Sequence, residues 1–98
     1  MANDKLHVEV AYGTPARQRV RALQVAPGTT VEDAIRASGV LEEFPAIDLE
    51  HAAVGVYGER VTLAERVQDG DRVEIYRGLR ADPKEARRQR ARRRDRTG

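Results

Sequence analysis

The chain has 98 residues, no cysteine, and 18 Lys/Arg against 16 Asp/Glu. This length fits one domain, and a hydrophobic fraction of 40% can support a modest core. Without cysteine there can be no disulfide, thiol nucleophile, or thiolate-bound zinc or iron–sulfur site. The net charge of +2 is unevenly spread, because residues 80–98 hold nine Lys/Arg against three Asp/Glu, a net charge of +6. We therefore predict a mildly acidic domain over residues 1–79 and a basic, partly helical or disordered tail over residues 80–98.

Two strands are predicted at the start of the chain. Apolar and polar residues alternate over Leu6–Tyr12, which is typical of a half-buried strand. A Gly-Thr-Pro-Ala turn follows at 13–16, and a second strand is expected over Val20–Val25. The alternation in the second strand is imperfect, so we expect a β-bulge or a phase slip around Arg21–Ala22, which would bring Val20 onto the same face as Leu23 and Val25.

A short helix should follow, with Thr30 as its N-cap and Gly39 at its C-terminal end. Its apolar face would consist of Val31, Ala34, Ile35 and Ser38. Further elements are expected in this order: a loop or single turn at Val40–Pro45, core contacts from Ile47 and Leu49, a strand at Val54–Tyr57, a short strand near Val61, a turn at Asp69–Asp71, and a last strand at Asp71–Arg77.

This order of elements predicts an α+β fold of the ubiquitin-like β-grasp type. We expect a mixed sheet of four to five strands, with one main helix packed on one face. In this arrangement the first and last strands are central and parallel, which agrees with their being the two best-patterned strands.

Several segments resemble the RnfH family, also called uncharacterised protein family 0125. They are Val8–Tyr12, Thr30–Gly39, Ile47–Leu49, Val54–Val56, Asp69–Arg77 and the continuation to Glu85. The resemblance implies a ubiquitin-like fold, a bacterial cytoplasmic protein and no established enzymatic activity. Neither a secretory signal nor a membrane span is predicted, so a cytoplasmic setting is expected on both grounds.

Enzymatic chemistry is not expected. Sulfur carriers and protein modifiers of this fold use a terminal Gly-Gly, whereas this chain ends Thr97-Gly98 behind an arginine-rich segment. Ser38 is interpreted as a polar helix terminus, Asp69 and Asp71 as turn formers, and Glu42-Glu43 as a solvated loop. His7 and His51 are interpreted as surface histidines without a partner at metal-ligand spacing. We therefore predict no catalytic residue, cofactor or metal.

The outer face of the sheet is the first candidate binding surface. If Val73 and Ile75 face the helix, Arg72, Glu74 and Tyr76 must face outward beside the neighbouring first strand. The candidate partner-binding residues are His7, Glu9, Arg72, Glu74 and Tyr76. An exposed Tyr beside Arg and Glu suits a protein interface. The alternative is an ordinary polar sheet face held by cross-strand charge pairs.

The tail is the second candidate. Asp82-Pro83-Lys84-Glu85 is typical of a helix start, but the following residues have no apolar stripe. Its candidate contacts are Arg87, Arg88, Arg90, Arg92, Arg93 and Arg94. RNA or the ribosome, an acidic protein surface, or no specific role are all left open. We predict a monomeric, non-catalytic protein-interaction adaptor without membrane insertion, with an RNA- or ribosome-associated factor as the alternative.

Overall fold

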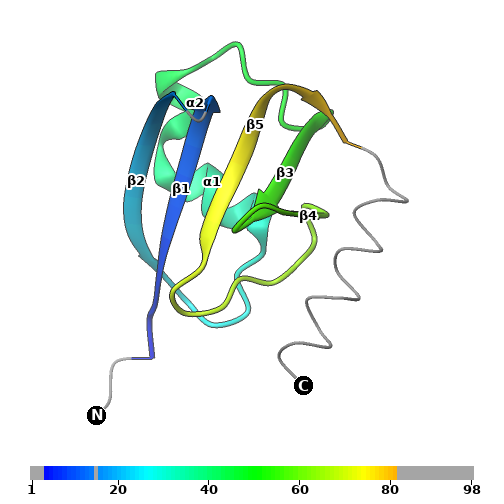
Figure 1. Ribbon diagram of the computed structural model, residues 1–98. Coiled ribbons are helices and arrows are strands. Elements are labelled where there is room, and N and C mark those ends of the chain that lie inside the picture. Colours follow the sequence, from blue (N-terminus) through cyan, green and yellow to red (C-terminus); the bar gives the residue numbers. More distant parts are fainter. Residues whose placement is uncertain (1–3, 15, 82–98) are drawn as a thin grey trace.

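The computed structural model describes residues 4–14 and 16–81. They form a five-stranded mixed sheet in the order β2-β1-β5-β3-β4, with the two helices against one face (Figure 1). The elements are β1 (Leu6–Thr14), β2 (Arg17–Val25), α1 (Val31–Ser38), α2 (Val40–Glu43), β3 (Ala52–Val56), β4 (Glu59–Val61) and β5 (Arg72–Arg80). No helix in the described part of the chain is long and apolar enough to span a membrane.

Strands β1 and β5 are parallel neighbours at the centre of the sheet, and all other pairings are antiparallel. The β1–β2 register runs without interruption from Leu6↔Val25 to Thr14↔Arg17. The prediction of a bulge or phase slip around Arg21–Ala22 is therefore wrong. Val20 instead points away from the helices, with 40% of its surface exposed, while the regular register keeps Val25 on the core side.

The core lies between the sheet and α1. Its largest fully buried side chains come from β1, α1, α2 and β5, and they are Val10, Val31, Ile35, Val40, Val73 and Ile75. Ala34 is also fully buried, which confirms the apolar face expected for this helix. Leu49 is buried and Ile47 packs partly buried against the core, as the sequence predicted.

The main helix has the predicted ends. The backbone N–H of Asp33 donates to Thr30 Oγ1 at 3.1 Å, which satisfies one of the unpaired donors of the first turn. Gly39 ends α1 in the left-handed conformation, with φ of 83°, and the chain then makes the single turn of α2. Gly39 therefore links α1 to α2, and α2 lies within Val40–Pro45, the segment that was expected to be a loop or a single turn.

The last strand is longer than expected. β5 continues to Arg80, which pairs with Ala52 beyond a register shift between Ala52 and Ala53. The backbone N–H of Ala81 also donates to the His51 carbonyl at 2.9 Å. Strand β5 therefore extends one residue past Leu79, the position after which the basic tail was expected to begin. The predicted helix start at Asp82 and the candidate arginines of the tail lie outside the described residues.

Candidate functional site: the outer face of the sheet

The face of the sheet opposite the helices carries all five residues predicted there, and four of them lie close together. The β1–β5 register places Glu9 beside Arg72, Ala11 beside Glu74, and Gly13 beside Tyr76. Neighbouring residues in such a register share a face, and the intervening Val73 and Ile75 are buried toward the helices. Sequence alternation alone was therefore enough to orient Arg72, Glu74 and Tyr76.

Arg72 and Glu74 organise the charges on this face. Arg72 Nη1 lies 3.6 Å from Glu9 Oε1, and Arg72 Nε lies 3.8 Å from Glu74 Oε2. The Arg72 guanidinium also donates to the Gln18 side chain on β2. Glu74 Oε1 accepts hydrogen bonds from the Gly58 backbone N–H at 2.8 Å and from the Tyr76 hydroxyl at 2.7 Å. The carboxylate of Glu74 therefore connects the central strand to the β3–β4 turn.

Tyr76 is half-buried, so the expectation of an exposed Tyr is wrong. Its ring covers Gly55 on β3, where no side chain competes for the space. Arg60 of β4 packs on the same ring, with its guanidinium carbon 5.4 Å from the ring centroid. Burial, the hydrogen bond to Glu74 and the charge of Glu74 raise the pKa of the Tyr76 hydroxyl, which therefore stays a neutral donor.

Small residues form the floor between these polar groups. Ala11 and Ala53 face outward but are 2% and 1% exposed, because their neighbours cover them. The exposed side chains of Val20 and Ala22 on β2 supply accessible apolar surface on this face. The sequence analysis missed Ala53, Gly55 and Arg60, because their position depends on how β3 and β4 pair with β5.

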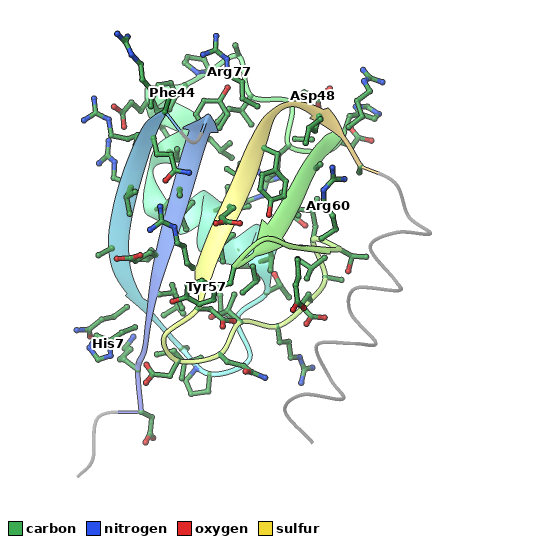
Figure 2. The ribbon with its side chains drawn as sticks, viewed as in Figure 1. His7, Phe44, Asp48, Tyr57, Arg60 and Arg77 are labelled. Carbon is green, nitrogen blue, oxygen red and sulfur yellow. The ribbon has the colours of Figure 1, made fainter. Side chains whose placement is uncertain are left out.

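His7 lies apart from this group, near the opposite end of the face from Tyr76. Its backbone N–H donates to Asp69 Oδ1 at 2.7 Å, and its Nδ1 lies 3.5 Å from the same oxygen. These contacts lower the pKa of Asp69. A hollow of about 450 Å³ is lined by His7, Glu9 and Tyr57 of the β3–β4 turn. Figure 2 shows His7 and Tyr57 on either side of this region. The described residues therefore bring together Glu9, Arg72, Glu74 and Tyr76, with His7 at the margin.

His51 has a partner that the sequence analysis missed. Its Nδ1 lies 2.8 Å from Asp48 Oδ2, and this hydrogen bond lowers the pKa of Asp48. The spacing of three residues could have revealed the pair. Ligand atoms of Asp48, Glu50 and His51 lie within 4.8 Å of one another, but all three side chains are exposed. The positive charge of Arg80 also contributes to the lowered pKa of Asp48.

Three further residues clarify the remaining predictions. Glu43 is not a solvated loop residue, because its carboxylate pairs with Arg19 Nε at 3.0 Å and with the guanidinium of Arg21. Ser38 is a polar helix terminus as predicted, since its hydroxyl donates to the Ile35 carbonyl at 2.6 Å. Asp71 is nearly buried in the predicted turn, where Asp71 Oδ2 accepts the backbone N–H of Gln68 at 2.8 Å.

The central parallel pair β1–β5, with α1 packed across one face, defines a ubiquitin-like β-grasp protein. Two solved structures share this fold with the chain. The small archaeal modifier protein 1 of H. volcanii has a TM-score of 0.57 at 23% identity, covering 76% of this chain and 99% of its own. The ubiquitin of Caldiarchaeum subterraneum has a TM-score of 0.53 at 17% identity, covering 74% of this chain and 91% of its own.

The chain belongs to the RnfH family, since the sequence pattern described as "RnfH family Ubiquitin" matches residues 6–90. Protein RnfH of Yersinia pestis is 57% identical over 86 residues, covering 88% of this chain and 92% of that protein. Protein RnfH of Salmonella newport is 58% identical over 88 residues, covering 90% and 92% respectively. A Haemophilus influenzae protein, solved as a 3D domain-swapped dimer, is 40% identical with a TM-score of 0.50, covering 82% of this chain and all of that one.

Proposed function

We propose that the protein is a non-catalytic interaction module that binds a protein partner through the outer face of its sheet. The supporting observation is the composition of this face. Glu9, Arg72 and Glu74 form a linked row of charges across the two central strands. Covered alanines lie beside this row, and exposed Val20 and Ala22 adjoin it on β2. An apolar surface bordered by oriented charges is the usual composition of a protein–protein interface.

The rigidity of the charged groups supports the same function. Arg72 and Glu74 are already held by neighbouring residues, so binding would immobilise few additional side chains. Pre-organised groups lower the entropic cost of association. The cytoplasmic setting and the monomeric state expected from the sequence remain part of this proposal. The Haemophilus influenzae relative was solved as a domain-swapped dimer. Size-exclusion chromatography with light scattering would therefore measure whether this chain is a monomer.

Site-specific photo-crosslinking tests the proposal. A benzophenone amino acid would be placed at Val20, on the outer face, or at Ala37, an exposed position on α1. We expect the Val20 form to crosslink one protein in living bacteria, and the Ala37 form not to. Introducing Arg72→Glu should remove that crosslink, because it reverses the charge at the centre of the row. Equal crosslinking from both positions, or an unchanged crosslink in Arg72→Glu, would contradict the proposal.

The basic tail supports a second candidate function, association with RNA or the ribosome. Residues 80–98 carry a net charge of +6, with six of the arginines between positions 87 and 94. Phosphate contacts by such a segment weaken steeply as salt is added, whereas the sheet-face interface should respond less. Co-sedimentation with ribosomes at low and high salt, for the full chain and for a truncation ending at Ala81, separates the two functions.

A further inference from the structure

Arginines gather at one end of the domain, where the β1–β2 turn, α2 and the end of β5 meet. The group consists of Arg17, Arg19, Arg21 and Arg77. Figure 2 shows Arg77 and Phe44 at this end. Residues 1–79 hold nine Lys/Arg against 13 Asp/Glu, a net charge of −4. The four arginines at this end therefore have the opposite sign to the net charge of the domain. This end is therefore locally basic.

A hollow of about 510 Å³ lies among these arginines. Its lining combines the aromatic residues Tyr12 and Phe44 with Arg17, Arg19 and Arg77. The two rings pack together, with centroids 5.0 Å apart and planes inclined at 47°. Both side chains are half-buried, so each ring is anchored in the core and also reaches the hollow. The site thus offers aromatic surface and guanidinium groups within one concave region.

Two of the arginines that line the hollow, Arg19 and Arg77, retain capacity for a ligand. Arg19 pairs with Glu43, yet 61% of its side chain is exposed, and guanidinium can donate from several N–H groups. Among residues 4–14 and 16–81, the Arg77 side chain makes no hydrogen bond or ion pair. Glu43 neutralises part of the charge, and its pKa is lowered by the hydrogen bond from Arg21. A positive excess therefore remains at the hollow.

We propose that this end of the domain binds single-stranded RNA. Arg17, Arg19 and Arg77 would contact phosphates, and a base would pack against Tyr12 and Phe44. Guanidinium groups match phosphate oxygens in pairs, and bases stack on aromatic rings with little dependence on sequence. An acidic peptide would use the arginines but would gain less from the rings. Only Gly78, Leu79 and Arg80 separate Arg77 from the start of the segment that carries the remaining eight Lys/Arg. The site shares no candidate residue with the charged row of the sheet face, so either proposal can fail alone.

Fluorescence anisotropy with a labelled 12-nucleotide oligouridylate tests the phosphate contacts in the full chain. The test variant is Arg17→Ala/Arg77→Ala, and the control is Arg36→Ala/Arg66→Ala, which removes two exposed arginines elsewhere. Each lost phosphate contact should lower the slope of log Kd against log salt by about 0.7, so the test variant should lose about 1.4 and bind about tenfold more weakly at 150 mM salt. The control should change affinity less than about twofold. Equal losses in both variants would overturn the proposal, as would full competition by polyglutamate of matched charge.

The aromatic contact has its own test, because Phe44 is the single phenylalanine and its ring signals are unambiguous by NMR. We expect these signals to shift upfield when oligouridylate is added to the wild-type chain, and to stay in place with inorganic polyphosphate. Phe44→Leu should weaken oligouridylate binding by about fivefold, the lower end of the range for one stacked base, and leave polyphosphate binding unchanged. Identical shifts with both polyanions would exclude base stacking, even if Phe44→Leu does not fold.

Discussion

The ring of Tyr76 occupies the space above Gly55 that a side chain on β3 would otherwise take. A Cβ on Gly55 would overlap the Tyr76 hydroxyl oxygen and lie 3.0 Å from Cε2 of the ring. It would also lie 2.6 Å from the carbonyl oxygen of Glu59. Glycine at position 55 therefore sets the orientation of Tyr76, and through it the hydrogen bond to Glu74.

Gly55→Ala should destabilise the fold and displace Tyr76. We expect a loss of about 1–3 kcal/mol in the free energy of unfolding, the usual cost of overpacking, measured by urea denaturation. The double variant Gly55→Ala/Tyr76→Phe should lose less than the sum of the single variants, because the hydroxyl makes the closest contact. Strict additivity would show that the Glu59 carbonyl, and not Tyr76, causes the loss.

Tyr76 should ionise at higher pH than an ordinary tyrosine. Its pKa is raised by burial and by Glu74, so the folded state favours the neutral hydroxyl. A group with a raised pKa contributes stability below its unfolded-state pKa, about 10 for tyrosine, and this contribution is lost as pH rises further. Absorbance titration at about 295 nm should show an ionisation that occurs only with alkaline unfolding, and Tyr76→Phe should remove that step. A wild-type titration completed before unfolding would contradict this assignment.

Thr30→Ala should destabilise the protein through the start of α1. The substitution leaves the Asp33 backbone N–H without its acceptor, and we expect a loss of about 1 kcal/mol in the free energy of unfolding. Thr30→Ser is the matched control, because it keeps the hydroxyl and should lose less than half of that amount. Thermal unfolding followed by circular dichroism measures both. Equal losses would point to the threonine methyl group instead of the cap.

Glu43 should titrate below its ordinary pKa because of its contacts with β2. The hydrogen bond from Arg21 is the main cause, and the charge of Arg19 adds to it. A lowered carboxyl pKa contributes stability above the unfolded-state value, and this contribution disappears as pH falls through the folded-state value. In Arg21→Gln the pKa should rise toward the ordinary value, which NMR titration of the Glu43 side chain can follow. An unchanged pKa would mean that Arg19 alone holds the carboxylate.

Much of the fold could be predicted from local patterns. Alternation in β1 and β5 identified both central strands and the outward direction of Arg72, Glu74 and Tyr76. The cap at Thr30 and the glycine after α1 were likewise readable, because both depend on residues close in sequence. The β2 prediction failed in its phase, because Val20 looks like a core residue locally. Only pairing with β1, which matches Ala11 with Val20, shows that it faces outward.

The missing parts of the candidate site depend on contacts between distant segments. Tyr76 is half-buried because the β3–β5 register brings Gly55 under its ring, and no pattern within either strand specifies that register. Glu43 contacts Arg19 and Arg21, which lie more than twenty residues earlier in the chain. The adjacent Glu42 and Glu43 in the sequence therefore suggested a solvated loop and gave no sign of these ion pairs. Local sequence gave the direction of the side chains but not their neighbours.

The parallel pairing of β1 with β5 also determines how the domain resists mechanical force. The chain enters at the start of β1 and leaves at the end of β5, so tension between its two ends acts along these strands in opposite directions (Figure 1). Five register pairs, from Glu9↔Arg72 to Gly13↔Tyr76, are loaded together in shear and cannot open one after another. An unfoldase that pulls on residues 82–98 therefore applies its force first to β5, the central strand of the sheet. The domain should withstand that pull until the whole strand is released at once.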